Sequence, residues 1–177
     1  MISNLIPLNE FIVHQHCQFP GPRDVAKVVA EHKWWASTTD LEHAYLHVPM
    51  EVHSQALLGV MTQGQFWQFS SLPFGLQSAP AVFQRLVVDS LKVWMASNPE
   101  AVVYIYLDDI LCLGKTKGDC ARFTHSLRER LVELGWTLNW AKCTNPSEHF
   151  QWLGWNWGTP KALARPCKER RVSLRFQ

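Results

Sequence analysis

The sequence has no long apolar run, few charged residues and almost no net charge. None of its apolar stretches approaches the roughly 18 residues that a membrane-spanning helix needs, and its start does not follow the signal-peptide pattern. Charged residues make up 18% of the 177 residues, and the formal net charge of +2 is too small to identify a partner. An apolar content of 47% is that of a globular chain. We therefore expect a folded protein that does not enter a membrane.

The cysteines lack the spacing of a zinc finger or of a disulfide framework. The chain has five cysteines, an odd number, with no Cys-x-x-Cys pair. This predicts reduced thiols and an intracellular protein, in the cytoplasm, the nucleus or both. The stretch His14-Gln15-His16-Cys17 has no partner cluster at metal-binding spacing, so no metal is assigned to it.

Apolar periodicity predicts helices and strands in a mixed order. The predicted helices are residues 23–33, 78–97 and 119–134, with Ser78 as an N-cap and Gly135 as a stop. The predicted strands are residues 36–40, 57–61, 66–69, 102–107, 110–113, 136–139 and 150–157, with a hairpin turn at 62–65 and irregular chain at 4–17. This order indicates one α+β domain with a largely antiparallel sheet packed on helices.

Two adjacent carboxylates, Asp108 and Asp109, interrupt the apolar run "AVVYIYLDDILCLG". One reading is a solvated turn between two strands, although Asn-Gly or Asp-Gly would suit a turn better. The other reading is a site for a hard cation, because adjacent carboxylates repel one another and a bound Mg²⁺ takes oxygen ligands. One hairpin rarely supplies a full set of ligands, so a further carboxylate is expected from elsewhere.

Asp40 is the best candidate for that third carboxylate, because it also ends a short β-like run. Three carboxylates brought together in this way suit two-metal phosphoryl transfer. Glu42 and Glu51 are rival donors, and Glu42 reads more simply as a surface charge.

With these residues in view, the sequence resembles reverse transcriptases. "YLDD" at residues 106–109 is similar to their Tyr-x-Asp-Asp signature, and other blocks follow in the family's order. These are "SNLIPLNEFI" (fingers), "TTDLEHAYLHVPM" (first catalytic block), "SSLPFGLQSAPAVFQRLV" (Leu-Pro-x-Gly turn and helix), "LGWTLNWAKC" (a Gly and a downstream Lys) and "FQWLGW" (primer-grip hairpin). The resemblance covers residues 3–157. Among reverse transcriptases, the sequence is most similar in character to those of retrotransposons, including the tyrosine-recombinase-encoding (DIRS-like) type.

The resemblance implies the palm fold of a right-hand polymerase and the synthesis of DNA on an RNA template. It implies two Mg²⁺ ions, with Mn²⁺ as a substitute, held by Asp40, Asp108 and Asp109, the last being the weaker ligand. It implies a template–primer and deoxynucleoside triphosphates as partners. The resemblance implies that Lys142 approaches the triphosphate late in the reaction. Without the resemblance, this residue would be interpreted as an ordinary exposed lysine.

The resemblance also implies residues that contact the nucleotide and the primer. Tyr45 would exclude a ribose 2′-hydroxyl, although a Tyr packed in the core is the simpler reading of the residue alone. The remaining nucleotide-binding candidates are Leu41, through its carbonyl oxygen, Phe74, Gly75 and Gln77. The primer-grip candidates are Trp152, Leu153 and Gly154.

The sequence departs from the family's pattern at both ends. No basic fingers residue precedes "SNLIPLN", and Arg23 and Lys27 do not match it. We therefore expect a fingers–palm core at residues 1–157 with incomplete fingers, and a basic segment at 158–177 that begins a thumb or connection or is disordered. A full thumb, an RNase H domain and the rest of a polyprotein are expected to be missing.

Two other functions remain open at this stage. The missing parts suit a truncated copy that binds nucleic acid without catalysis. The palm would also suit an RNA-templated RNA polymerase, but Tyr45 argues against that reading.

Overall fold

The computed structural model describes residues 5–167 and divides the chain into two compact units. The first unit contains residues 1–18 and 43–86, and the second contains residues 19–42 and 87–177. Each unit is described by itself. Among residues 5–167, no helix is both long and apolar enough to cross a membrane.

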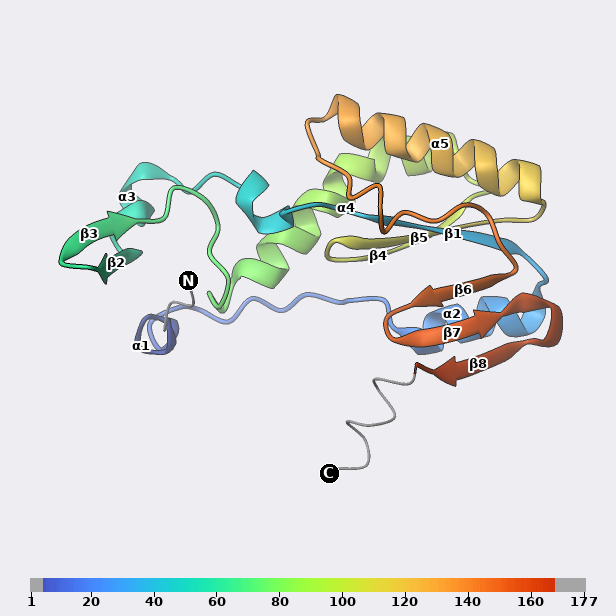
Figure 1. Cartoon of the computed structure of the whole chain (residues 1–177), viewed down its shortest axis with the longest axis horizontal. Coiled ribbons are helices and arrows are strands. Elements are labelled where there is room, and N and C mark those ends of the chain that lie inside the picture. The colour runs from blue at the N-terminus through green and yellow to red at the C-terminus, as the bar shows by residue number, and fades with distance from the viewer. Residues whose placement is uncertain (1–4, 168–177) are drawn as a thin grey trace. The chain divides into compact units, whose positions relative to one another are not determined.

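The first unit consists of short elements and a hairpin (Figure 1). Its elements are α1 (Ile6–Asn9), the 3-10 helix η1 (Ala44–His47), α3 (Val52–Gln55), β2 (Gly59–Thr62), β3 (Gln65–Gln68) and the start of α4 (Ala79–Ser97). The predicted hairpin is confirmed, and its turn residues Gln63 and Gly64 both have positive φ, as this type of tight turn requires. The prediction of irregular chain at residues 4–17 is wrong at α1, whose proline lies in the first turn.

The second unit contains two antiparallel sheets and two long helices besides the end of α4. Its strands are β1 (Trp35–Asp40), β4 (Val102–Tyr106) and β5 (Asp109–Gly114), in the order β1-β5-β4, and β6 (His149–Trp152), β7 (Trp155–Gly158) and β8 (Leu163–Pro166), in chain order. Its helices are α2 (Pro22–Glu31), α5 (Lys117–Glu133) and the 3-10 turn η2 (Thr159–Lys161). The predicted α+β class with antiparallel sheets is confirmed.

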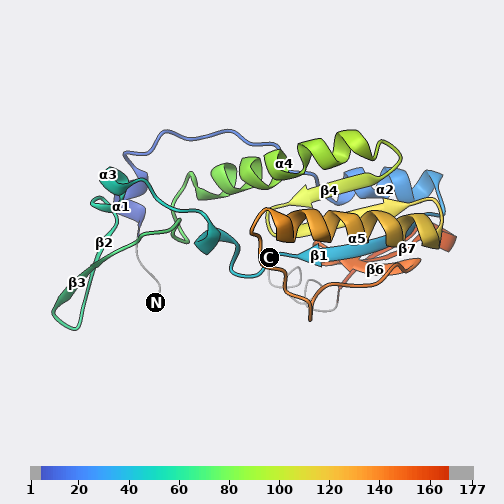
Figure 2. The ribbon, with the colours of Figure 1, turned by 90° about the horizontal axis from the view of Figure 1, so that it is seen from above.

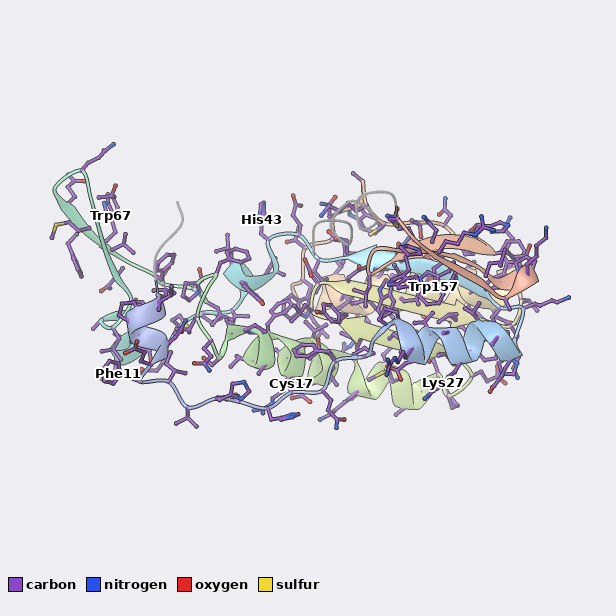
Figure 3. All side chains as sticks on the ribbon, turned by 90° about the horizontal axis from the view of Figure 1, so that it is seen from below. Phe11, Cys17, Lys27, His43, Trp67 and Trp157 are labelled. Carbon is purple, nitrogen blue, oxygen red and sulfur yellow. The ribbon has the colours of Figure 1, made fainter. Side chains whose placement is uncertain are left out.

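The central strand β5 of the β1-β5-β4 sheet is buried on both faces, which explains its near-continuous apolar run. Helix α5 lies along one face (Figures 1 and 2) and buries a stripe of side chains at helical spacing, Cys120, Phe123, Thr124, Leu127 and Leu131. On the other face, Leu111 and Leu113 join a core with α2 and the β6-β7-β8 sheet that includes Trp152 and Trp157. Trp157 is labelled in Figure 3. Residues of β5 alternate between the two cores because successive side chains point to opposite faces.

Several predicted boundaries are wrong. Residues 136–139 form no strand and instead run beside the free edge of β1, where Leu41 and Leu138 form an isolated bridge. The single strand predicted at 150–157 is two strands, β6 and β7, joined by a turn at Leu153 and Gly154. Helix α5 starts at Lys117 with Thr116 as its cap, two residues before the predicted start.

The basic segment predicted at residues 158–177 contains more regular structure than its composition suggests. Residues 163–166 form β8, which pairs with β7. Residues 168–177, with most of the basic side chains, lie outside the described residues. The prediction of one domain over residues 1–157 stays a prediction.

Gly114 joins β5 to α5 at a point where only a glycine fits. A Cβ atom at this position would lie 2.5 Å from the backbone nitrogen of Cys120 and 2.8 Å from its Cα. We expect Gly114→Ala to lower the free energy of unfolding by about 1–3 kcal/mol, because the α5 backbone must move to make room. Urea denaturation measures this change.

Gly118→Ala is the matched control. A Cβ there meets nothing closer than the Thr116 hydroxyl at 3.8 Å, and alanine is the better helix former. Its unfolding free energy should be unchanged or slightly higher. Equal destabilisation by the two substitutions would contradict the packing argument.

Candidate functional site

Asp108 and Asp109 occupy different positions in the β4–β5 hairpin. Leu107 and Asp108 form its two-residue turn, whereas Asp109 is the first residue of β5 and pairs with Tyr106. The sequence analysis had placed both carboxylates between the strands. Leu107 has a φ of 54°, a left-handed conformation that costs energy for a branched side chain. Strain of this kind is often found at functional sites.

Asp40 lies beside this hairpin because β1 pairs with β5. It ends β1, and its Cα partner across the antiparallel ladder is Asp109. The backbone N–H of Leu41 donates to the carbonyl oxygen of Asp108 over 2.9 Å, so the ladder continues past the last strand residue. The structure therefore brings together the three aspartates that the sequence analysis singled out.

The three carboxylates act on one another electrostatically. Burial first, and then the charges of Asp108 and Asp40, raise the pKa of Asp109 to about 7, although Lys142 and a hydrogen bond from the Leu153 backbone act in the opposite direction. Burial also raises the pKa of Asp40, against the lowering effect of Lys142. The site thus concentrates negative charge that a cation would neutralise.

Lys142 is the cation that already lies at this site. Its Nζ atom is 3.4 Å from Oδ2 of Asp40, with the lysine side chain 64% exposed and the aspartate side chain 17% exposed. The backbone supports this pair, since the N–H of Asn139 donates to the Asp40 carbonyl oxygen over 2.9 Å. The rival donors differ: Glu42 adjoins Asp40 and raises its pKa, whereas Glu51 caps α3 in the first unit.

Two of the three predicted primer-grip residues, Leu153 and Gly154, form the β6–β7 turn, and Trp152 is the last residue of β6. Leu153 and Gly154 have φ values of 49° and 72°, and the Leu153 backbone donates a hydrogen bond to Asp109. Trp152 is 1% exposed and packs in the core of the second unit. The turn backbone is therefore beside the carboxylates, while the Trp152 ring supports the turn from within.

The predicted nucleotide-binding residues, apart from Leu41, belong to the first unit. Tyr45 packs against Phe74 and Phe83, with ring centroids 4.9 and 5.1 Å apart. Gly75 has a φ of 90°. The sequence analysis missed Asn9, whose amide donates to the Gly75 carbonyl while its side-chain oxygen accepts from the Gln77 backbone N–H. No local pattern marks Asn9, because both bonds reach more than 60 residues along the chain.

The donor set of the site suits a hard divalent cation. Carboxylate and backbone carbonyl oxygens are the ligands that Mg²⁺ prefers. Within residues 5–167, no group of three or more carboxylate, imidazole or thiol side chains is already gathered closely enough to hold a metal ion. The chemistry of the residues therefore fits, whereas a preformed cage is not present among the described residues.

Comparisons with known proteins agree on one family. The family model described as "Reverse transcriptase (RNA-dependent DNA polymerase)" matches residues 1–157. The Gag-Pol polyprotein of Koala retrovirus is 26% identical over 179 residues, covering 94% of this chain and 11% of that protein. The Pol polyprotein from the Drosophila melanogaster transposon gypsy is 23% identical over 154 residues, covering 87% of this chain and 14% of that protein.

A solved structure shares the fold. The foamy viral protease-reverse transcriptase in complex with an RNA/DNA hybrid aligns with a TM-score of 0.81 and 20% identity, covering 98% of this chain and 22% of that chain. The chain thus spans about a tenth of the length of the first polyproteins, with 11% and 10% covered, and under a quarter of the solved chain.

The pKa of Asp109 predicts how stability depends on pH without metal. The folded-state pKa of about 7 exceeds the ordinary value of 3.8, so the folded protein binds this proton more tightly than the unfolded chain. Its contribution to stability is therefore present below pH 4 and is lost as the pH rises to about 7. Asp109→Asn removes the titration and should raise the unfolding free energy by roughly 1–3 kcal/mol at pH 8.

Urea denaturation of both proteins in EDTA, from pH 4 to pH 8, measures the difference. Asp89→Asn is the control, because Asp89 is an exposed residue paired with Lys92 on α4. A difference between Asp109→Asn and the parent that stays constant over this pH range would show that Asp109 titrates normally.

Proposed function

Because the chain belongs to the reverse transcriptase family, we propose that it is the polymerase core of an RNA-directed DNA polymerase. The observation that carries the proposal is the pairing of Asp40 with Asp109 across β1 and β5, with Asp108 in the adjoining turn. Three carboxylates at the end of one sheet are suited to nucleotidyl transfer, which joins a deoxynucleotide to a primer 3′-hydroxyl.

The metal is part of this proposal. Asp40, Asp108 and Asp109 would hold two Mg²⁺ ions, or Mn²⁺, and these would supply charge neutralisation on the triphosphate and a lowered pKa of the attacking hydroxyl. The mutual repulsion of the carboxylates supports this assignment. The Leu41 carbonyl oxygen offers a further neutral ligand next to Asp40.

The remaining roles belong to residues of this chain. Lys142, held beside Asp40, would stabilise the charge of the leaving pyrophosphate and would give it a proton. The β6–β7 turn, whose backbone already bonds Asp109, would position the primer end. Tyr45, packed against Phe74 and Phe83, would present a rigid ring to the sugar of the incoming nucleotide, with Gly75 and Gln77 as further contacts.

The partners and the setting follow from the same proposal. Solved relatives are complexes with an RNA/DNA hybrid and with double-stranded DNA, which supports a template–primer as the partner here. The curated relatives are polyproteins, which supports a thumb and an RNase H domain in a longer parent protein. Five free cysteines support an intracellular setting, in the cytoplasm or the nucleus. We also propose the subtype, which is a retrotransposon of the tyrosine-recombinase-encoding (DIRS-like) type.

Asp108→Asn tests the metal assignment directly. Replacing a carboxylate with a neutral amide should weaken Mg²⁺ binding by about tenfold or more, since the cation loses a charged ligand. Calorimetry with template–primer and deoxynucleotide present measures the affinity, and primer extension on an RNA template measures activity. Asp89→Asn makes the same chemical change on the exposed face of α4 and should alter neither the Mg²⁺ affinity nor the activity.

Unchanged Mg²⁺ affinity in Asp108→Asn would contradict the assignment of this residue to the metal site. If the parent protein binds nucleic acid but does not extend a primer, the non-catalytic alternative would be favoured.

Tyr45→Val tests sugar selection. A smaller side chain should admit the ribose 2′-hydroxyl and raise ribonucleotide incorporation relative to deoxynucleotide incorporation by roughly tenfold or more. Tyr45→Phe keeps the ring and should leave the selectivity close to that of the parent. Single-nucleotide primer extension with each sugar gives the ratio. Equal incorporation of both sugars by the parent would instead support an RNA-templated RNA polymerase.

A further inference from the structure

Arg128 is a half-buried cation on the face of α5 that packs against the sheet. It continues the buried stripe, since it lies four residues after Thr124 and eight after Cys120. An arginine on that stripe must find hydrogen-bond acceptors in the protein, because burial without them is costly. Arg130, on the same helix, donates to Glu133 within one turn of α5.

The guanidinium of Arg128 joins two segments that are distant in sequence. Its Nε atom donates to the Thr39 hydroxyl over 3.0 Å. Its Nη2 atom lies 2.9 Å from the Thr38 carbonyl oxygen and 2.7 Å from the Thr144 carbonyl oxygen, and 3.3 Å from the Ser37 hydroxyl. The partners are thus three consecutive residues of β1, which end immediately before Asp40, and one residue two positions after Lys142.

Residues 137–147, which we call the edge segment, run beside β1 without forming a regular strand. Near its start, the Asn139 N–H donates to the Asp40 carbonyl; further on, the Thr144 N–H donates to the Thr38 carbonyl over 3.0 Å. Lys142 lies between these two attachments. An open surface pocket of about 590 Å³, lined by Arg128, Trp140 and Pro146 among others, borders the edge segment.

We propose that Arg128 is a positioning residue that sets the separation between the Asp40 carboxylate and the Lys142 ammonium. It does so by holding the last residues of β1 and the chain after Lys142 to one rigid, planar group. The roles of Asp40 and Lys142 in catalysis rest on the proposed function, whereas the contacts of Arg128 do not. Lysine cannot replace arginine here, because an ammonium lacks the fork that reaches several acceptors at fixed angles.

Zero-length cross-linking with a carbodiimide tests the separation without any need for activity. The reagent joins a carboxylate to an amine only where the two are in contact, so the yield of the Asp40–Lys142 amide, measured by peptide mass spectrometry, reports their proximity. We expect this yield to fall several-fold in Arg128→Lys and further in Arg128→Met. The Asp89–Lys92 pair on α4 is the internal reference and should cross-link equally in every variant.

Arg130→Lys and Arg130→Met are the matched controls, because they make the same changes on the same helix away from β1. Both should cross-link as the parent does. Urea denaturation shows whether each variant folds, and Arg128→Lys carries the test if Arg128→Met does not. An unchanged Asp40–Lys142 yield in a folded Arg128 variant would overturn the proposal, whether or not the chain has polymerase activity.

Kinetics separate positioning from general stability. If Arg128 acts through Lys142, Arg128→Lys should lower kcat with little change in the KM for template–primer, and its effect should largely disappear in a Lys142→Ala background. Fully additive effects on kcat would overturn the positioning role. Absence of activity in the parent would count against the proposed function, and the cross-linking result would still decide the role of Arg128.

Discussion

The antiparallel register of β1 and β5 is the constraint on which the candidate site depends. It places Asp40 opposite Asp109 and leaves Asp108 in the turn beside them. Backbone hydrogen bonds hold this register, so the Cα atoms of Asp40 and Asp109 cannot move apart to relieve the repulsion without breaking the ladder. If β5 shifted by one residue against β1, the Asp109 side chain would turn to the other face of the sheet. The β5 side chains that now face α5 would then face the opposite core, and those in that core would face α5. The packing of the sheet therefore keeps the carboxylates near one another, and a bound cation would reduce the repulsion between them.

The surroundings of the sheet serve the same arrangement. On one face, the tryptophan-rich core fixes the β6–β7 turn, whose backbone bonds Asp109. On the other face, α5 brings Arg128 to a β1 strand whose buried residues Ser37, Thr38 and Thr39 are polar. A polar strand in a core is costly unless its hydrogen bonds are satisfied. Arg128 and Thr144 satisfy them, which links the composition of β1 to the placement of the edge segment.

The sequence allowed the main helices and strands to be predicted because their apolar periodicity is strong. The proximity of Asp40 to Asp108 and Asp109 also followed from chemistry and from the family resemblance, but their register did not, because pairing over 69 residues leaves no local pattern. Residues 136–139 resembled a strand by composition, yet they meet the chain at the end of β1 in an isolated bridge, Leu41 with Leu138, and do not form a regular ladder. Asn9 carries no local signal. Arg128 carries one, since it lies on the buried stripe of α5, and a cation at such a position indicates acceptors on the facing strand.

Backbone strain is found at the two turns nearest the carboxylates. Leu107 and Leu153 both adopt left-handed φ values that a glycine would take at lower cost. A turn that served only to reverse the chain would favour Asn-Gly, as the sequence Gln63-Gly64 in the exposed β2–β3 hairpin nearly does. At Leu107 the turn sets where Asp108 lies, and at Leu153 it aims a backbone N–H at Asp109. Gln63 has the same left-handed φ in the exposed hairpin, so the contacts with the carboxylates, and not the φ values alone, distinguish Leu107 and Leu153.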